Sequence, residues 1–311
     1  MNIQGLWKRI PAWGQAFLIA LLLLLFVHCF LFKWVAVRST SMYGTLLPGD
    51  LLGVQRWPVW SGLHRGDILV FHDPVQDDRP MRQRQLLVKR IAGVPGDEVA
   101  LRDGRLHVNG QPLPAPPGLT TRWAVRVKEQ ADVPAMLRRI GLPADYVLPG
   151  QTVFDLPLNE HLVAALKADP HVAGLLPARS PTRMKGYLFP HGPNYRWNND
   201  NYGPLPVPAE GDTVDVNAYT LPLYDRIISR YEHNDLAVAG RELLINGTPL
   251  EHYVIGQDYY FVLGDSRDNS SDSRYWGFVP ADHVVGRAGL VLLNADGLER
   301  PLGHGRWFIG L

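Results

Sequence analysis

The sequence contains a single cysteine, Cys29, and this residue lies inside an apolar run. One cysteine cannot form an intrachain disulfide, and it provides no Cys/His cluster of the kind that holds zinc. The 11 histidines are scattered, with no H-x-x-x-H pair on a segment of helical pattern. A metal-dependent mechanism is therefore disfavoured.

An excess of charge of one sign is also missing. The 31 lysine and arginine residues are balanced by 30 acidic residues, which leaves a formal net charge of +1. Proteins that bind nucleic acid usually carry a basic field that attracts phosphates. The charge balance therefore argues against nucleic acid as a partner. At 311 residues the chain is long enough for one large domain or for two ordinary ones.

One long apolar run, PAWGQAFLIALLLLLFVHCFLF, occupies residues 11–32. As a helix, these roughly 22 residues would cross a hydrocarbon core of about 30 Å. A cleaved secretory signal is the alternative, but such signals have shorter apolar segments that end in small residues, whereas this run ends in Phe-Leu-Phe. We therefore predict a retained transmembrane anchor over residues 11–32.

The direction of this anchor is only weakly marked by charge. Lys8 and Arg9 precede the run, while Lys33 and Arg38 follow it, so the positive charges on the two sides nearly balance. The shortness of the N-terminal segment favours a cytoplasmic location for residues 1–10. No other stretch is apolar for long enough to span a membrane, so the remainder is predicted to form one ectodomain on the far side.

The ectodomain is predicted to be mainly β. Short apolar or alternating runs are bounded by Gly, Pro or Asp, which is typical of strands. These runs are DLLGVQRW, GDILVFHDP, LLVKRIAGV, GDEVAL, YYFVLGD and VVGRAGLVLLN. Two Asn-Gly pairs, Asn109-Gly110 and Asn246-Gly247, lie between strand-like flanks. Each pair predicts a type I′ hairpin turn, because both central residues of that turn take positive φ.

The composition changes over residues 115–205, where Pro-rich connectors flank short helical patterns. In NEHLVAALKAD, Asn159 can cap a helix and Asp169, which precedes a proline, can end it. A further helix is predicted near Pro222, because proline suits the first turn. We therefore predict an inserted α+β substructure within one β core. The predicted boundaries are 36–114 and 206–311 for the catalytic β core and 115–205 for the insertion.

A candidate nucleophile, Ser41, follows the apolar run in the segment VRSTSMYGTLLPGDLLGV. The glycines and the proline of this segment allow the backbone to bend and to bring amide N–H groups near the hydroxyl. Serines in turns are usually structural, so Ser41 alone is weak support for catalysis. The pKa of a serine hydroxyl is too high for attack on an amide, so a base must lie within hydrogen-bond reach.

Lys89, in the segment QLLVKRIAGVPGDEV, is the candidate base. Its apolar neighbours Leu87, Val88 and Ile91 predict a buried strand into which one lysine can be drawn. Burial disfavours the ammonium form and lowers the pKa of a lysine towards the range of a general base. A solvent-facing strand lysine is the alternative. Arg90 is expected to point to the opposite face and to remain in solvent.

A third segment, YYFVLGDSRDNSSDSRYWGFVP at residues 259–280, is too polar for a core strand. A well-capped turn would explain it without any chemistry. Asp272 and Arg274 can form an ion pair that fixes such a loop, and Ser270 could lie against the lysine amine and direct it towards the nucleophile.

These segments, taken in order, resemble the type I signal peptidases. The boxes that carry the resemblance are STSMYGTLLPGD from Ser39, RGDILVFHDP from Arg65, VKRIAGVPGDEV from Val88 and GDSRDNSSDSRYWG from Gly264. Besides the single anchor, the resemblance covers residues 36–110 and 205–295.

The resemblance implies a serine/lysine dyad within a signal-peptidase-like β ectodomain. By this likeness Ser41 is the nucleophile, Lys89 is the general base, and the Ser39 hydroxyl forms the oxyanion hole together with the Ser41 N–H. The resemblance also implies two shallow apolar pockets for Ala-like side chains before the cut, and no cofactor. The residues that would orient the lysine and fix the loop are Ser270, Asp272 and Arg274.

The sequence departs from the family pattern at two positions within the boxes. Gly44 occupies the position of the family's proline and is expected to loosen the turn beside the nucleophile. Ser266 replaces the usual asparagine. The FPHGPNYRWNNDNYGP stretch resembles that of a subgroup with a longer insertion.

The function that the resemblance implies is removal of N-terminal signal peptides from exported preproteins. The enzyme would be a single-pass protein of the bacterial cytoplasmic (inner) membrane, with its catalytic domain on the outer (periplasmic) face and with preproteins and the lipid bilayer as partners. A dedicated peptidase that matures pilus or conjugation proteins remains open because of the insertion. A non-catalytic membrane-anchored binding protein is disfavoured by the presence of both Ser41 and Lys89. A self-cleaving repressor would need a DNA-binding domain where this chain has its apolar run.

Overall fold

The computed structural model describes residues 11–26, 31–140, 142, 147–180, 188–240, 242–250, 252–294 and 306–311. The predicted cytoplasmic segment, residues 1–10, lies outside these described residues. Residues 27–30 of the predicted anchor, Cys29 among them, lie outside them as well.

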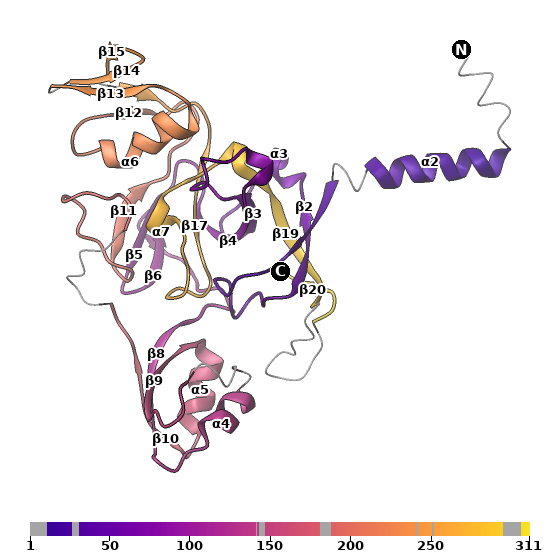
Figure 1. Cartoon of the computed structure of the whole chain (residues 1–311), viewed down its shortest axis with the longest axis vertical. Coiled ribbons are helices and arrows are strands. Elements are labelled where there is room, and N and C mark those ends of the chain that lie inside the picture. Colours follow the sequence, from indigo (N-terminus) through magenta and orange to yellow (C-terminus); the bar gives the residue numbers. More distant parts are fainter. Residues whose placement is uncertain are drawn as a thin grey trace.

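The central sheet joins the first strands of the chain to the last ones (Figure 1). Its strands are β1 Phe32–Ala36, β2 Asp50–Gln55, β3 Ile68–His72, β4 Leu86–Gly93, β17 Tyr259–Leu263, β18 Val279–Pro280, β19 Val284–Asn294 and β20 Ile309–Gly310. Their order is β1-β2-β19-β3-β4-β17-β18, with β20 on β19, and the paired strands are antiparallel. The six predicted strand runs all contain strands, five of them in this sheet.

The smaller sheets outside the central sheet and the lobe contain both predicted hairpin turns. Asn109 and Gly110 have φ values of 52° and 77° and join β6 to β7, while Asn246 and Gly247 have values of 51° and 80° and join β14 to β15. Both predictions are confirmed. The strands are β5 Glu98–Arg102, β6 Arg105–Val108, β7 Gln111–Pro112, β11 Tyr202–Pro206, β12 Thr213–Asp215, β13 Leu236–Ala239, β14 Glu242–Ile245, β15 Thr248–Pro249 and β16 His252–Val254.

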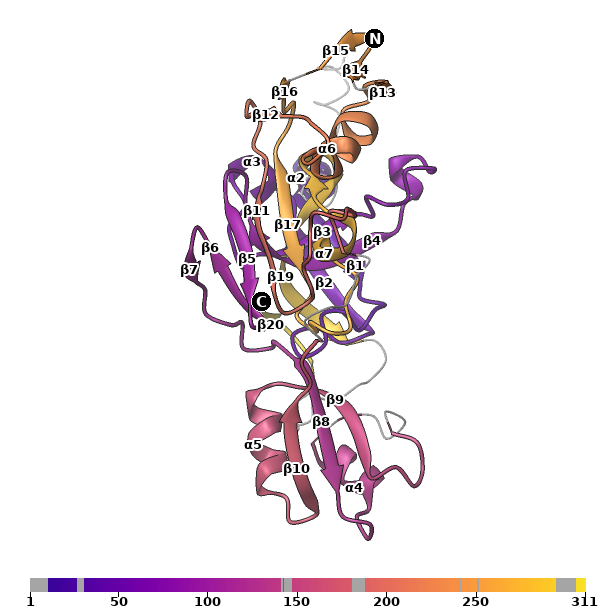
Figure 2. The same ribbon diagram turned by 90° about the vertical axis from the view of Figure 1, so that its left-hand side faces the viewer.

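A separate lobe, residues 121–177, stands at the opposite end of the molecule from β13–β15 (Figure 2). Asn159 Oδ1 accepts a hydrogen bond from the Leu162 N–H at 2.9 Å and caps the helix, which ends before Asp169, as predicted. The lobe buries its own apolar cluster, in which Val125, Leu137 and Leu166 are fully enclosed. Its elements are β8 Thr121–Val127, α4 Val133–Arg139, β9 Val153–Leu158, α5 Glu160–Ala168 and β10 Val172–Pro177.

Apart from the N-terminal helix, which is described next, the remaining helices are short. The helix predicted near Pro222 is present, with the proline in its first turn. These helices are α3 Pro58–Ser61, η2 Met81–Gln83, α6 Leu221–Arg226, its π-helical continuation η4 Ile227–Tyr231, α7 Ser273–Trp276 and η5 Ala281–His283.

The first described helix, α2 (Ala12–Phe26), has 15 residues and projects away from the body of the molecule (Figure 1). A search of the described residues finds no helix with both the length and the apolarity that a membrane crossing requires. The last residue of the predicted anchor, Phe32, begins β1 and pairs with Gln55 of β2.

Both faces of the central sheet are covered by apolar side chains. Leu52, Val54 and Val70 are fully buried on one side, and Leu69 and Phe71 are fully buried on the other. Complete burial of each such side chain contributes about 1.5–3 kcal/mol relative to exposure. β4, the strand of this sheet that carries Lys89, is therefore held in place by packing on both of its faces.

A buried ion pair ties the C-terminal segment to the start of β2. Arg306 donates from Nε and Nη2 to the two carboxylate oxygens of Asp50, at 2.8 and 2.5 Å, and both side chains are almost wholly buried. Arg306 Nη2 also donates to the Thr45 carbonyl at 3.1 Å, and the Leu47 N–H donates to Asp50 at 2.8 Å. The pair therefore fixes the turn that follows Ser41.

Removal of Arg306 should destabilise the fold, because a carboxylate would remain buried without its partner. We expect Arg306→Ala to lower the free energy of unfolding by about 3–5 kcal/mol, measured by urea denaturation of the full chain in detergent. Arg102 is exposed and serves as the control, since Arg102→Ala should change stability by less than about 0.5 kcal/mol. Equal midpoints for the two variants would contradict the assigned role of the pair.

Candidate active site

The structure brings together the two side chains that the sequence pairs as nucleophile and base. Ser41 lies in the turn between β1 and β2, and Lys89 lies within β4. Lys89 Nζ and Ser41 Oγ are 2.6 Å apart, in hydrogen-bond contact. Their exposed fractions are 3% for Lys89 and 7% for Ser41, so the contact is shielded from bulk water.

The surroundings of Lys89 favour its uncharged form. Burial lowers the pKa of the Lys89 amine below its ordinary value of 10.5, and this outweighs the opposing attraction of Asp272 and Asp73. The amine also donates to the carbonyl of Val88 at 3.2 Å. A neutral amine in contact with a hydroxyl can accept its proton, which is what a general base must do.

Ser39 lies beside Ser41, the candidate nucleophile, and is exposed to solvent. Its Oγ is 3.1 Å from Ser41 Oγ, and the residue is exposed. The Ser39 hydroxyl, a possible donor, is therefore two residues from the Ser41 backbone N–H, a second donor. Such a pair of donors can stabilise negative charge that develops on an oxygen near Ser41.

The polar segment that follows β17 holds in place the turn between β1 and β2, which carries Ser41 and is called the nucleophile turn below. The Ser266 N–H donates to the Ser41 carbonyl at 3.0 Å, and Asn269 Nδ2 donates to Thr40 Oγ1 at 2.9 Å. The contact at Ser266 comes from the backbone, so the replacement of asparagine by serine at this position leaves it intact.

Gly264 provides the space in which this segment approaches Ser41. A Cβ at Gly264 would lie 2.2 Å from Ser270 Oγ and 2.5 Å from the Ser41 carbonyl oxygen. Ser270 Oγ is buried and makes no hydrogen bond of good geometry, although the hydroxyl lies close enough to help lower the pKa of Asp272. Ser270 as the partner that orients the lysine remains a prediction, because the Lys89 amine contacts Ser41 and Val88 instead.

Asp272 and Arg274 form an ion pair in which both side chains are almost completely buried. Arg274 donates from Nε and Nη2 to the two carboxylate oxygens, each at 2.9 Å, and the Gly264 N–H donates to Asp272 at 3.0 Å. Burial alone would raise the pKa of Asp272, but the Arg274 charge and these hydrogen bonds hold it below its usual value. The loop is therefore fixed by a charged pair that stays ionised.

Arg90 points to the opposite face as expected, but its side chain is only 19% exposed and is paired, so the expectation that it remains in solvent was wrong in that part. Its guanidinium donates from Nε and Nη2 to the carboxylate of Asp265, at 2.9 and 2.6 Å, and from Nη1 to the Gly66 carbonyl at 2.7 Å. Arg90 does point away from the Lys89 side of the strand, but Asp265, from the loop after β17, and Gly66 contact it on that face. Thr45 Oγ1 also donates to Asp265, at 2.5 Å.

Asp265 is the site residue that sequence reasoning missed. It joins β4, which carries Lys89, to the turn that carries Ser41, through Arg90 and Thr45. The available signal was the acidic residue beside Gly264 in the last family box, together with an arginine next to the lysine. Their pairing depends on contacts between segments 175 residues apart in the chain.

Gly44 is required by close packing. Its φ of +96° lies in a region that proline cannot adopt, and a Cβ there would lie 2.2 Å from the Gly118 carbonyl oxygen. Gly118 precedes β8, the first strand of the lobe, and the Thr120 N–H donates to the Asp265 carbonyl at 2.9 Å. The segment that leads into the lobe is therefore packed against the nucleophile turn.

A methyl group at Gly44 should strain both segments. We expect Gly44→Ala to cost about 2–4 kcal/mol of folding free energy, the sum of a positive φ and a backbone clash. Gly96→Ala is the matched control, because Gly96 has φ of +83° with open space around it, and it should show the conformational part alone. Thermal unfolding of both variants measures the difference, and equal losses would contradict the packing argument.

Comparison with known proteins places this geometry in a family. The family model for signal peptidases, peptidase S26, matches residues 10–151 and 207–293, which together make up well over half of the chain. The match includes the apolar run and all four boxes, and it leaves residues 152–206 unmatched.

Individual proteins are similar to this chain over different shares of its length. A signal peptidase I from Buchnera aphidicola subsp. Baizongia pistaciae is 22% identical over 317 residues, with 98% of this chain and 82% of that protein covered. Signal peptidase I T from Bacillus subtilis is 36% identical over 105 residues, with 33% of this chain and 51% of that protein covered. A crystal structure of a signal peptidase I from Enterococcus faecalis V583 is 20% identical and covers 73% of this chain and 96% of that one, with a TM-score of 0.25. The extent of the family match decides the assignment: this chain belongs to the signal peptidase family, peptidase S26.

Proposed function

We propose that this protein is a membrane-anchored endopeptidase that removes N-terminal signal peptides from exported preproteins. The observation that carries the proposal is the 2.6 Å contact between the buried Lys89 amine and the Ser41 hydroxyl. Membership of the signal peptidase family supports the choice of substrate.

The proposed reaction is acyl transfer through a serine ester. Ser41 Oγ attacks the carbonyl carbon of the scissile bond while the neutral Lys89 amine takes its proton. The carbonyl oxygen becomes an oxyanion, and the Ser41 N–H and the Ser39 hydroxyl donate hydrogen bonds to it. Each such donor contributes roughly 3 kcal/mol in related chemistry.

Collapse of the tetrahedral intermediate breaks the peptide bond. The leaving amine takes the proton from the Lys89 ammonium, and the signal peptide remains esterified to Ser41. Lys89, neutral again, then removes a proton from water, which attacks the ester carbonyl and releases the signal peptide with a new carboxylate. The cycle requires no cofactor, because Lys89 accepts and returns each proton.

We further propose that residues 11–32 anchor the enzyme in the bacterial cytoplasmic membrane as a single pass. The described part of this run, α2, carries no charged side chain, and large apolar residues such as Trp13 and Phe17 are exposed on it. A helix that is apolar on all sides suits a lipid environment. The catalytic domain would then lie on the outer (periplasmic) face, where the cleavage site of a membrane-held signal emerges.

A dedicated peptidase for pilus or conjugation proteins is the second candidate. It is favoured by the contact between the lobe and the site, since Tyr43 of the nucleophile turn packs against the core of the lobe. Profiling cleavage across a panel of preproteins and pilin precursors separates the two candidates, because a dedicated enzyme would cut only the latter.

Removal of either dyad side chain should abolish cleavage. We expect Ser41→Ala and Lys89→Ala each to reduce cleavage of a preprotein with an A-x-A site by at least about 10³-fold. Lys89→Arg should not restore it, because a guanidinium does not give up its proton. Ser61→Ala, at an exposed serine of α3, is the control for serine replacement. Near-normal cleavage by either alanine variant would rule out the dyad.

The pH dependence should follow the deprotonation of Lys89. The protonated amine cannot act as a base, so activity should rise with pH, with a midpoint below 10.5 because burial lowers the Lys89 pKa. Asp73 attracts the ammonium form, so Asp73→Asn should move this midpoint to lower pH by a fraction of a unit. Asp78→Asn, at an exposed carboxylate nearby, should leave the midpoint unchanged. A shift to higher pH in Asp73→Asn would contradict the assignment of Lys89 as the base.

A further inference from the structure

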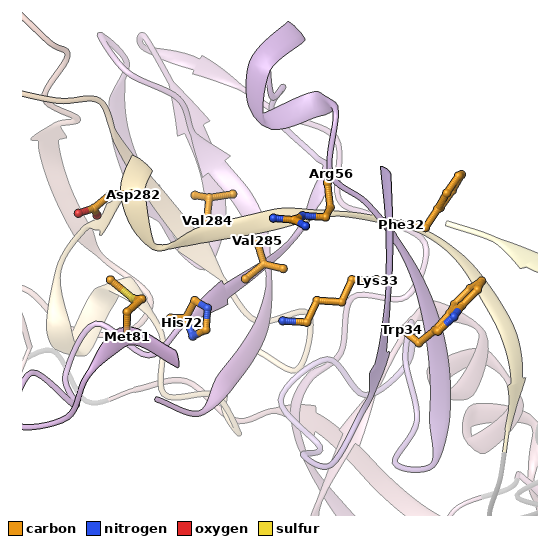
Figure 3. Close-up of a pocket in the computed structure, with 9 residues that line it drawn as sticks. All are labelled: Phe32, Lys33, Trp34, Arg56, His72, Met81, Asp282, Val284 and Val285. Atoms are coloured by element: carbon orange, nitrogen blue, oxygen red, sulfur yellow. The ribbon is translucent and has the colours of Figure 1, made fainter. Parts of the chain in front are cut away.

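A pocket of about 710 Å³ lies where β4, the β5–β6 turn and the loop after β17 meet. Residues 112–119, which lead into the lobe and are called the proline segment below, contribute to its wall. It is larger than the pocket of about 550 Å³ at the edge of the central sheet, which Lys33 and Asp282 help to line (Figure 3). Neither Ser41 nor Lys89 lines the larger pocket, so the proposed reaction leaves this space unused.

Arg267 brings a buried positive charge without a partner to the wall of this pocket. The residue is 8% exposed, and its Nε is buried without a hydrogen-bond partner. Its charge is attracted by Asp272 and Asp265, but each of these carboxylates is already paired with another arginine. Arg267 itself forms no ion pair within the described ranges. Burial lowers its pKa to about 10, so the guanidinium is still protonated at neutral pH.

The backbone of Arg267 is fixed on both sides. Its N–H donates to the Thr120 carbonyl at 3.0 Å, and its carbonyl accepts a hydrogen bond from Arg274 Nη2 at 2.6 Å. These contacts would form with any side chain at this position. A buried guanidinium normally has hydrogen bonds or a carboxylate that offset the loss of its hydration. The internal contacts of the fold therefore do not account for an arginine here.

The charges of the pocket wall leave only Arg267 unmatched. Arg65 is paired with Asp97, to which its Nε donates at 2.7 Å. Arg105 and Glu160, which are exposed, contribute opposite charges. A single anionic group balances the one remaining positive charge. A carboxylate fits this requirement better than a doubly charged phosphate, and its two oxygens match the fork of a guanidinium.

The rest of the wall is largely apolar. It includes four prolines of the proline segment, which supply no backbone N–H donor. A peptide in the pocket would need donors for its carbonyl groups, whereas a hydrocarbon needs none. The larger apolar side chains of the wall are Ile91, Leu106, Leu113, Leu119 and Leu263. These surfaces therefore suit a hydrocarbon attached to the anionic group.

We propose that this pocket binds a carboxylate that carries a short hydrocarbon body. The two carboxylate oxygens would accept hydrogen bonds from the Arg267 guanidinium, while the hydrocarbon would lie against the leucines and prolines of the wall. The site takes no part in the proposed proteolysis.

An occupant of the pocket would contact two segments that hold the nucleophile turn. One is the loop after β17, whose Ser266 N–H donates to the Ser41 carbonyl at 3.0 Å. The other is the proline segment, in which Gly118 lies against Gly44. A ligand that binds only the folded chain stabilises it by mass action. Binding should therefore raise the temperature of unfolding.

Saturation-transfer difference NMR on the full chain in dodecyl maltoside tests this site, with irradiation in the aromatic region, where the detergent has no resonances. Hexanoate, 1-hexanol and acetate are the probes. We expect saturable binding of hexanoate, and at least tenfold weaker binding of the other two, because 1-hexanol lacks the charge and acetate lacks the hydrocarbon. Arg267→Met should bind hexanoate at least tenfold more weakly. Arg105→Gln removes an equal charge from an exposed part of the wall and should bind as the unmodified protein does.

Thermal unfolding distinguishes a ligand-binding role of Arg267 from a structural one. Because its buried charge has no partner, Arg267→Met should unfold at the same temperature as the unmodified protein or at a higher one. Hexanoate should raise the midpoint of the unmodified protein and leave that of Arg267→Met unchanged. Arg267→Lys keeps the charge, provides a second variant if the first does not fold, and should still prefer hexanoate to 1-hexanol.

Several outcomes would overturn the proposal. Equal binding of 1-hexanol would remove the need for an anion, and equal binding of acetate would remove the need for a hydrocarbon. Tighter binding of the peptide acetyl-Ala-Leu-Ala than of hexanoate would assign the pocket to peptides. An equal loss in Arg105→Gln would indicate diffuse surface charge. A lower unfolding temperature of Arg267→Met with normal hexanoate binding would make the arginine structural.

Discussion

The site depends on a lysine amine that is kept dry while it touches a serine hydroxyl. A lysine side chain is usually solvated and cationic, so its burial within β4 requires cover from other parts of the fold. The loop after β17 holds the Ser41 turn, which contacts this amine, through the Ser266 N–H. The cost of enclosing Lys89 is offset by the apolar packing on both faces of the central sheet.

Two ion pairs hold the loops around this amine without making it cationic. Asp272 attracts the ammonium form of Lys89, but Arg274 neutralises Asp272 at close range, so burial remains the larger influence on the lysine pKa. Asp265 is matched in the same way by Arg90. The two loop carboxylates, Asp272 and Asp265, are therefore each paired with an arginine.

The two ends of the molecule relate differently to this site. The lobe has its own apolar core, yet the segment that leads into it is packed against Gly44 of the nucleophile turn. At the other end, β1 begins at Phe32, the last residue of the apolar run. The turn that carries Ser41 is thus joined to the lobe by packing and to the apolar run through β1.

The sequence by itself determined the strand runs, the two Asn-Gly hairpins, the cap at Asn159 and the pairing of Ser41 with Lys89, because each of these follows from local patterns or from family boxes. Tertiary structure alone decided the surroundings of these residues. The pairing of Arg90 with Asp265 and the approach of Gly118 to Gly44 join segments that are remote in the chain. A local pattern records which backbone conformations are allowed, whereas the environment of a charge depends on which distant segment covers it.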